Sequence, residues 1–425
     1  MLISRPRGTN DILPGQVDKW QYIESAIRQI CREYGYAEIR TPIFEHTELF
    51  RRGVGETTDV VEKEMYTFWD KGETSITLRP EGTAATVRAF VENGLLGQSL
   101  PLKLYYLGPM FRYDRPQAGR YRQFHQFGVE VLGTRDPLVD AEVIAMAMDL
   151  YERLGLRHLD LQINSVGCPT CRQEHRAALR SFLSPRVHEL CDNCRQRLER
   201  NPMRILDCKG EKCQTVTVGA PATLHYLCKD CTEHFQMVRT ALDDLGIHYW
   251  LNERLVRGLD YYTQTAFEIT VAGIGAQSSI GGGGRYDGLV EEIGGPSTPG
   301  VGYALGLERV LLALEQQGVQ LPGHQELDVF LVTLGEEARR PAFVLLHRLR
   351  SMGLSVNMDY LGRSLKAQMK QAGKAGARLV IIVGGEELER RGVSVRDMGE
   401  SKQKEIPLSE LEDFLRTKFV LINQG

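Results

Sequence analysis

The sequence predicts an α+β protein, in which an antiparallel sheet interrupted by helices is followed by a smaller α/β domain. In residues 1–320 the expected strands and helices do not alternate regularly, which argues against a doubly wound parallel sheet. Beyond residue 326 strands and helices do alternate, as in a compact α/β domain. Between residues 168 and 235 the strand pattern is lost and cysteines accumulate, so we expect an insertion there.

The composition is that of an ordinary globular protein. Of the 425 residues, 42% are hydrophobic and 25% are charged. The net charge of −3 excludes a basic nucleic-acid coat, so any nucleic-acid contact must come from local patches. The N-terminus lacks a signal-peptide pattern, and no stretch approaches the roughly 20 apolar residues that span a bilayer. We therefore expect a cytoplasmic protein with no membrane contact, whose cysteines are thiols or metal ligands rather than disulfides.

The first hundred residues predict a helix and two strand regions. The apolar residues that recur at helical spacing are Trp20, Ile23, Ile27, Ile30 and Tyr34. Gly35 is well placed to end this helix. Residues 37–44 follow as a strand, in which Pro42 implies an edge or an end. Residues 76–94 predict a short strand, a turn at Pro80 and a second helix.

From residue 102 onward the pattern predicts the remaining elements and the domain limits. The expected elements of the core are a hairpin with strands at 102–113 and 121–133, a helix at 136–155, and strands at 158–167, 257–273, 278–290 and 300–306, the last leading into a helix. The expected divisions are a first segment of the catalytic core at 1–167, the insertion at 168–240, a second segment of the core at 241–320, a linker near 317–325 and a C-terminal domain at 326–425.

The second strand of the hairpin predicts a ligand-binding face. Arg122, Gln126 and Glu130 are four residues apart and so project to one side of a strand. Gly128 lies between two of them and leaves a gap in which a ligand has room. The opposite face carries Phe127, Val129 and Val131. A solvated polar strand face is the alternative interpretation.

Arginines crowd the hairpin and predict an anionic partner. Those of the segment 112–122 are Arg112, Arg115, Arg120 and Arg122. Arg309 lies near a helix N-terminus, which is favourable to anions, and guanidinium groups match phosphate oxygens. The sequence contains no P-loop, and its glycine-rich stretch at 281–284 lacks the dinucleotide-binding fingerprint. Each arginine taken alone is equally compatible with an ordinary surface position.

The segment 257–269 adds a second set of candidate residues. Arg257 next to a glycine allows close approach to a phosphoryl group, and Asp260, Tyr261 and Tyr262 follow it. A buried tyrosine needs a hydrogen-bond partner, so Tyr262 could serve a polar substrate. Tyrosines of the core are the alternative.

A helix of the C-terminal domain predicts contact with a nucleic-acid backbone. Its cations, at spacings of three and four residues with no acid among them, are Arg363, Lys366, Lys370, Lys374 and Arg378. A solvated helix face is the alternative.

The cysteines of the insertion predict two structural zinc sites. They pair in sequence as Cys168 with Cys171, Cys191 with Cys194, Cys208 with Cys213, and Cys228 with Cys231. Tetrahedral zinc takes four thiolates, and each CxxC turn supplies two of them. Which pairs combine cannot be read from the sequence, and free or redox-active thiols are the alternative. Cys31 stands apart in the first helix.

These motifs together resemble the histidyl-tRNA synthetases of bacteria, a family of class II aminoacyl-tRNA synthetases. The resemblance rests on "GPMFRYDRPQAGRYRQFHQFGVEVLG", "TLRPEGT", "LVRGLDYYTQTAFEI", "SIGGGGRYDGL" and "GYALGLERV" and covers nearly the whole chain, apart from the cysteine-rich insertion. It implies a class II antiparallel catalytic core, an inserted domain, a C-terminal anticodon-binding domain and a homodimer. It also implies L-histidine, ATP with Mg²⁺ and tRNA(His) as partners.

The resemblance also implies roles for single residues. Arg112 would hold the ATP α-phosphate and the histidine carboxylate, Arg309 the γ-phosphate, and Arg257 the α-phosphate during attack. The expected histidine-binding residues are Glu81, Gly82, Thr83, Arg112, Gln126, Glu130, Arg257, Tyr261 and Tyr262. Within this set, Glu81, Thr83 and Gln126 would grip the α-amino group, and Glu130 and Tyr262 the imidazole. Arg115 and Gln117 would face the acceptor end of the tRNA.

Two other proteins have a similar core. One is the regulatory subunit of histidine biosynthesis, which lacks the anticodon-binding domain expected here at 326–425. The other is a tRNA-binding sensor with an inactive core, in which the arginines that bind ATP would be lost. Because Arg112, Arg257 and Arg309 are all present, we expect an active histidine–tRNA ligase.

Overall fold

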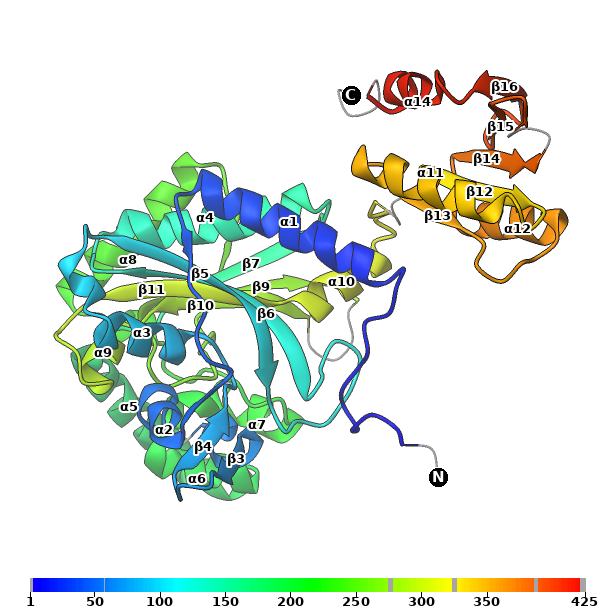
Figure 1. Ribbon diagram of the computed structural model, residues 1–425. Helices are drawn as coiled ribbons and strands as arrows, with labels where there is room; N and C mark the ends of the chain where they lie inside the picture. Colours follow the sequence, from blue (N-terminus) through cyan, green and yellow to red (C-terminus); the bar gives the residue numbers. More distant parts are fainter. Residues whose placement is uncertain (1–2, 57, 274–277, 323–326, 386–388, 421–425) are drawn as a thin grey trace. The chain divides into compact units, whose positions relative to one another are not determined.

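The structure, a computed structural model, describes residues 3–56, 58–273, 278–322, 327–385 and 389–420. The chain forms two compact units, Met1–Pro322 and Gly323–Gly425 (Figure 1). The linker expected near 317–325 lies partly outside the described residues, which stop at 322 and resume at 327.

The first unit is built on a large, mostly antiparallel sheet. Its strand order is β1-β5-β6-β11-β10-β9-β7-β8, and the parallel pairs are β1 with β5 at one end and β7 with β8 at the other. The strands are β1 (Ala37–Glu38), β5 (Leu102–Phe111), β6 (Gln123–Leu132), β7 (Leu159–Ser165), β8 (Trp250–Leu251), β9 (Thr263–Val271), β10 (Ser279–Arg285) and β11 (Gly300–Gly306). The predicted antiparallel sheet and its central hairpin, β5 and β6, are therefore confirmed.

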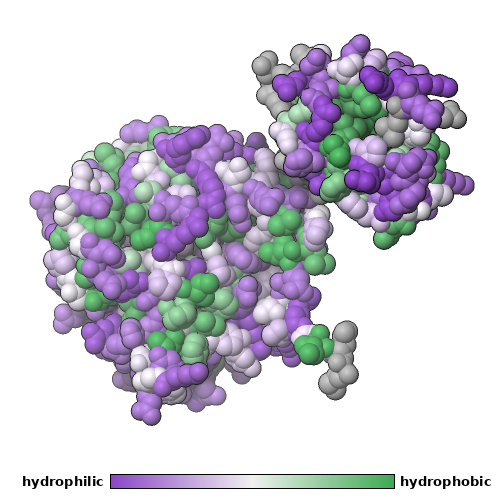
Figure 2. All heavy atoms as spheres, in the orientation of Figure 1, coloured by the Kyte–Doolittle hydropathy of each residue, from purple (hydrophilic) through white to green (hydrophobic). Residues whose placement is uncertain are grey.

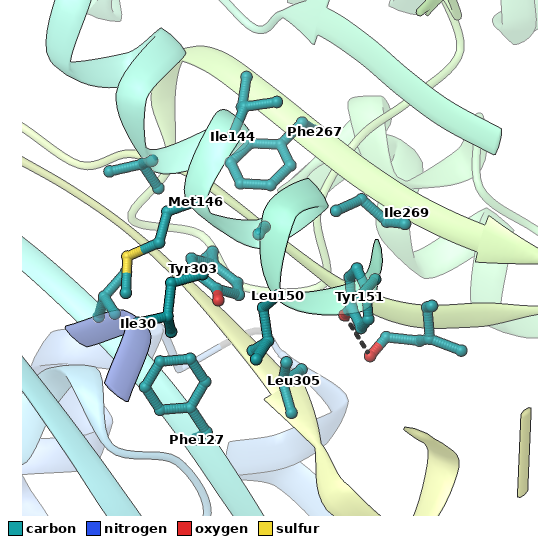
Figure 3. Close-up of a cluster of buried hydrophobic side chains, with 14 of the residues drawn as sticks. Ile30, Phe127, Ile144, Met146, Leu150, Tyr151, Phe267, Ile269, Tyr303 and Leu305 are labelled. Atoms are coloured by element: carbon teal, nitrogen blue, oxygen red, sulfur yellow. Dashed lines mark hydrogen bonds between the residues drawn. The ribbon is translucent and has the colours of Figure 1, made fainter. Parts of the chain in front are cut away.

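Long amphipathic helices cover one face of this sheet. They are α1 (Val17–Glu33), α4 (Pro137–Arg153), α8 (Lys229–Asp244) and α10 (Leu307–Gln316). Figure 3 shows side chains of α1 and α4 meeting those of the strands: Ile30 of α1 and Leu150 of α4 lie near Phe127 and Tyr303 of the sheet, and Ile144 of α4 lies beside Phe267. The apolar stripe predicted for α1 is the face that it buries against the sheet. Fully burying one such side chain stabilises the fold by about 1.5–3 kcal/mol.

The N-terminal part of the chain also forms a small second sheet. It has the order β2-β4-β3, with β2 (Phe44–His46), β3 (Tyr66–Trp69) and β4 (Ser75–Leu78). The prediction of one strand over 37–44 is wrong, because the chain makes β1 in the large sheet and then β2 in the small one. Pro42 lies at the break, where its missing N–H removes a ladder hydrogen bond. Helices α2 (Thr47–Val54) and α3 (Thr83–Glu92) flank this region.

The insertion is helical. It contains α5 (Pro169–Leu183), α6 (Asp192–Arg200) and α7 (Glu211–Val216), joined by short 3₁₀ turns, before α8 returns the chain to the large sheet. Its own small core is formed by Leu183, Leu190, Leu198, Ile205 and Val216, together with buried cysteines.

The second unit is the expected α/β domain. Its sheet has the order β13-β12-β14-β15-β16. The elements are β12 (Val329–Leu334), α11 (Arg339–Ser351), β13 (Val356–Met358), α12 (Leu365–Lys374), β14 (Leu379–Gly384), β15 (Gly392–Asp397), β16 (Gln403–Pro407) and α14 (Leu411–Val420). Strands β12, β13 and β14 are parallel, as the alternation of strands and helices predicts.

The prediction that five cations share one helix face is wrong for Arg363 and Arg378, because the first precedes α12 and the second follows it. Arg363 contacts Asp359 at 3.3 Å, and Arg378 lies 3.9 Å from Asp328. These acids precede the helix, so the sequence pattern within it missed them. Lys366, Lys370 and Lys374 are exposed.

The surface in Figure 2 is mainly hydrophilic, with scattered hydrophobic residues. Among the described residues, no helix combines the length and the apolar character needed to cross a membrane.

Candidate active site

The large sheet carries a cavity of about 490 Å³. Arg112, Arg120, Arg257 and Arg309 all line it, although they come from three different parts of the chain, since Arg112 and Arg120 share the hairpin loop. Glu81, Thr83, Gln126, Glu130, Tyr261 and Tyr262 line the same cavity. The structure thus brings together most of the residues singled out in the sequence.

Backbone carbonyl groups orient two of the arginines. Arg112 Nε donates to the carbonyl oxygen of Pro80 at 2.8 Å, and its guanidinium lies 5.5 Å from the ring centre of Phe124. Arg309 Nε donates to the carbonyl oxygen of Ser279 at 2.5 Å. Burial and the nearby positive charge of Arg120 lower the pKa of Arg309. A bound anion would relieve this repulsion.

Arg257 lies flat on the glycine-rich strand β10. A Cβ atom at Gly282 would come within 2.7 Å of Arg257 Nη1, so only glycine leaves room for the guanidinium. Arg257 Nη1 donates to Glu268 Oε1 at 3.2 Å, while its buried Nε has no hydrogen-bond partner among the described residues. The strand expected over 257–273 starts only at Thr263, so Arg257 and Tyr262 belong to the loop before β9.

Glu130 forms the floor of the cavity with a tyrosine that the sequence pattern did not single out. Tyr286 donates its hydroxyl to Glu130 Oε2 at 2.5 Å. The other carboxylate oxygen, Oε1, is buried and has no hydrogen-bond partner within the described part of the chain. Burial raises the pKa of Glu130 to about 8. An unpaired buried acceptor is costly, which fits a ligand with an N–H group.

Glu81 is fixed by the start of helix α3. Its carboxylate accepts hydrogen bonds from the backbone N–H groups of Thr83, at 2.7 Å, and Ala84, at 2.8 Å. Burial nevertheless raises the pKa of Glu81.

Gln126 Oε1, on β6, is a further buried oxygen for which the described residues supply no donor.

The space above Gly128 is filled by a side chain of the protein and is not open to a ligand. A Cβ atom at Gly128 would lie 2.3 Å from the Tyr106 ring, and one at Gly82 would lie equally close to it. The expectation that this glycine leaves room for a ligand is therefore wrong, because the Tyr106 side chain of β5 fills the space. Gly82 packs against the same ring rather than forming part of the cavity lining described here. Tyr106 itself does line the cavity.

The hairpin loop separates the four crowded arginines. Arg122 stacks on Tyr113, 3.8 Å from its ring centre, and donates to the carbonyl oxygen of Asp114, so it does not share the cavity with Gln126 and Glu130. It precedes β6, which begins at residue 123, and the strand alternation therefore did not apply to it. Arg115 and Gln117 are exposed on the loop, outside the cavity lining of the described chain.

Comparison with known proteins shows the family of the chain. The family model of histidyl-tRNA synthetase matches residues 8–310, and that of an anticodon-binding domain matches residues 328–418. The histidine–tRNA ligase of Desulforamulus reducens is 63% identical over 418 residues, which cover 98% of this chain and all of the relative.

The chain belongs to the histidyl-tRNA synthetase family.

Further relatives support the same family. The histidine–tRNA ligase of Pelotomaculum thermopropionicum is 62% identical, with 98% of each chain covered. A crystal structure of apo histidyl-tRNA synthetase from S. aureus superposes with a TM-score of 0.84 at 46% identity, covering 98% of this chain and all of that one. The family makes this chain an aminoacyl-tRNA synthetase, a histidine–tRNA ligase with a class II fold.

The eight cysteines of the insertion form two clusters. The outer cluster contains Cys168, Cys171, Cys228 and Cys231, and the inner cluster Cys191, Cys194, Cys208 and Cys213. Within each cluster the sulfur atoms lie within 4.8 Å of one another. All nine cysteines are free, and Cys31 is buried in α1.

Three of the eight cluster cysteines lie at helix N-termini. Cys168, Cys191 and Cys228 are the N-cap residues of α5, α6 and α8, where helix dipoles favour negative charge. Although burial opposes the effect, hydrogen bonds from Cys171 and from the backbone of Thr170 lower the pKa of Cys168 to about 7. The geometry thus fixes a pairing that the sequence left open.

We expect the Glu130→Gln variant without ligand to be more stable than the wild type at alkaline pH. The folded protein keeps the proton of Glu130 up to about pH 8, whereas the unfolded chain loses it near the ordinary pKa of glutamate. The wild type therefore loses stability as the pH rises from the unfolded-state pKa to about 8. The gain in unfolding free energy should grow from near zero at about pH 4.5 to on the order of 2 kcal/mol or more at about pH 8.5. Urea denaturation across this pH range measures it.

Glu291→Gln, which neutralises an exposed carboxylate on α9 (Leu289–Glu292), is the matched control. A Glu130→Gln gain that does not depend on pH would contradict the raised pKa.

Proposed function

We propose that this cavity performs both steps of histidine–tRNA ligation. In the first step a carboxylate oxygen of L-histidine attacks the α-phosphorus of ATP, the bond to the bridging oxygen breaks, and pyrophosphate leaves. In the second step the terminal ribose hydroxyl of tRNA(His) attacks the carbonyl carbon, and AMP leaves. The observation that carries the proposal is the meeting of Arg112, Arg257 and Arg309 with buried Glu130 in one cavity.

The arginines divide the phosphates among them. Arg112 would hold the α-phosphate and the histidine carboxylate, and Arg309 the γ-phosphate. Arg257, whose buried Nε lacks a partner among the described groups, would stabilise charge on the α-phosphate during attack. Mg²⁺ bound with ATP would offset further negative charge of the triphosphate. Positioning and electrostatics dominate, because the protein forms no covalent bond to the substrate.

The buried oxygens select histidine. Glu130 would accept a hydrogen bond from one ring nitrogen of the imidazole, and Tyr262 would bind the other side. Glu81, Thr83 and Gln126 would hold the α-amino group, since each oxygen of Glu81 retains a lone pair beyond its backbone bond. Tyr261, 4.6 Å from Tyr262 between ring centres, supports that ring. An amino acid without ring nitrogens would leave Glu130 unpaired.

The tRNA would meet two exposed regions. Arg115 and Gln117 on the hairpin loop are free to approach its acceptor end. In the C-terminal domain, Lys366, Lys370 and Lys374 form an exposed cationic row on α12 for its phosphate backbone.

We also propose that the chain acts as a homodimer in the cytoplasm. The small sheet carries exposed aromatic residues, Phe44 at 57%, Phe68 at 47% and Trp69 at 71% exposure, of the kind that contacts between copies cover. The cytoplasm is where tRNA and ATP are both supplied.

Arg257→Ala should lower the rate of histidine-dependent ATP–pyrophosphate exchange by roughly 100- to 1,000-fold, the usual effect of losing one donor to a developing negative charge. Arg254→Ala, whose guanidinium contacts Thr217 outside the cavity lining, is the matched control and should retain most of its activity. Near-wild-type exchange by Arg257→Ala would remove that arginine from the mechanism.

We further propose that each cysteine cluster binds one structural Zn²⁺. Tetrahedral zinc with bonds of about 2.3 Å to sulfur places neighbouring sulfur atoms about 3.8 Å apart. The observed separations are 3.5 Å between Cys168 and Cys171 and 4.0 Å between Cys191 and Cys208. Backbone N–H groups donate to sulfur in both clusters, from Cys228 to Cys171 and from Cys191 to Cys213, as is usual around bound thiolates.

Metal analysis of the purified protein should find two zinc ions per chain, one for each cluster. Cys191→Ser and Cys168→Ser should each lose one ion, and Cys31→Ala, outside both clusters, should lose none. Unchanged zinc content in Cys191→Ser would exclude that residue as a ligand.

A further inference from the structure

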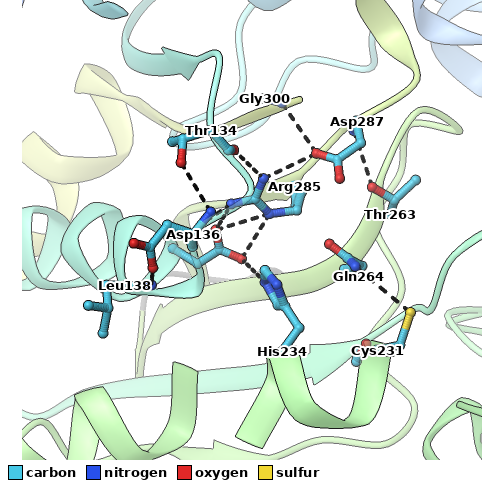
Figure 4. A network of polar contacts seen from close by, with 12 residues as sticks. Thr134, Asp136, Leu138, Cys231, His234, Thr263, Gln264, Arg285, Asp287 and Gly300 are labelled. Carbon is cyan, nitrogen blue, oxygen red and sulfur yellow. Dashed lines mark hydrogen bonds and ion pairs between the residues drawn. The ribbon is translucent and has the colours of Figure 1, made fainter. Parts of the chain in front are cut away.

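The outer cysteine cluster is attached to a rigid region of the catalytic core. His234 of α8, one turn after Cys231, contacts the carboxylate of Asp140 on α4, which Arg285 of β10 also contacts. Figure 4 shows His234 and Arg285 in this network. His234 Nε2 and Asp140 Oδ2 are 2.8 Å apart, and Arg285 and Asp140 are fully buried. Because this network fixes α8, it also fixes the cluster that α8 carries.

The cluster touches the strand that begins at the histidine pocket. Gln264 Nε2 donates to Cys231 Sγ at 3.9 Å, as Figure 4 shows. Gln264 has a φ of +46°, a left-handed conformation that costs free energy for a residue other than glycine. Two backbone hydrogen bonds hold it there, from Gln264 to Gly167 at 3.0 Å and from Val166 to Gln264 at 2.7 Å. The chain entering the cluster therefore packs directly on residue 264.

A second bond reaches the pocket itself. Arg172, next to the cluster residue Cys171, donates from Nη1 to the carbonyl oxygen of Tyr262 at 3.1 Å. Tyr262 lines the cavity, and the Arg257 guanidinium lies over the Tyr262 ring, 5.9 Å from the ring centre.

We propose that Arg172 and Gln264 are positioning residues through which the outer cluster and its metal set the affinity for histidine. The metal would lock the two ends of the insertion together, and the two side chains would transmit that fixed geometry to Tyr262. This inference rests on the proposed roles of Tyr262 and of the outer cluster. It gives the insertion a role in substrate binding, beyond a structural one.

Arg172→Ala should raise the KM for histidine about tenfold, because it removes the hydrogen bond that holds the Tyr262 backbone in place. The KM for ATP should stay within about twofold of the wild-type value. Arg180→Ala is the matched control, because Arg180 lies on the same helix and donates to the carbonyl oxygens of Leu198 and Glu199 inside the insertion. It should change neither constant. Arg172→Lys, which keeps one donor, should restore some of the histidine affinity.

A comparison of the two clusters tests the role of the metal. Cys231→Ser should lose one zinc ion and raise the KM for histidine as Arg172→Ala does, whereas Cys213→Ser should lose one ion and leave that KM unchanged. An equal effect of Arg172→Ala and Arg180→Ala, an equal rise in both KM values, or a Cys231→Ser enzyme that lacks zinc but binds histidine normally would overturn the proposal.

Failure of the underlying assignments has different signatures. A wild-type enzyme without histidine-dependent exchange would contradict the proposed function. A wild type without bound zinc would contradict zinc binding by the outer cluster and any effect of zinc on histidine affinity. The arginine variants would still decide whether Arg172 positions Tyr262.

Discussion

The active site depends on keeping several charged groups of like sign inside one partly buried cavity. Two unit charges about 4 Å apart interact several times more strongly near a protein than in water, so neighbouring guanidinium groups repel unless they are compensated. Each guanidinium has its own partner in the protein. Arg112 donates to the carbonyl oxygen of Pro80, and Arg309 donates to that of Ser279. Arg257 pairs with the carboxylate of Glu268. None of these contacts uses all the donors of a guanidinium, so each arginine can also bind an anion.

The fold follows from this requirement. Antiparallel strands bring residues 106, 126, 282 and 303 beside one another although they are far apart in sequence, and the loop before β9 adds Arg257 to the same cavity. Glycines on β10 and β6 let large side chains lie against the backbone, so that Arg257 and Tyr106 reach their places. Helices α1 and α4 seal the opposite face, and the buried core there makes the sheet a firm support. The insertion adds contacts to the start of β9 through residues next to its cysteines.

Much of this could be predicted from the sequence, because the pattern of apolar residues is local. The periodicity of α1 and the alternation of β6 gave the right core faces. The cysteines whose spacing predicts metal sites do gather in two groups of four, while the zinc itself stays a prediction. Contacts between distant segments could not be predicted in this way. The role of Gly128 depends on Tyr106 of the neighbouring strand, and Tyr286 reaches Glu130 from a turn after β10. The pairing of the cysteines likewise depends on where α8 returns, which no local pattern encodes.

The most direct test of the central claim is a crystal structure of this enzyme with a non-hydrolysable sulfamoyl analogue of histidyl-adenylate. We expect the sulfamoyl group, standing in for the α-phosphate, to lie within hydrogen-bond distance of both Arg112 and Arg257, and the imidazole to donate to Glu130. An analogue bound with its sulfamoyl group away from these arginines, or with its imidazole outside the reach of Glu130, would contradict that claim.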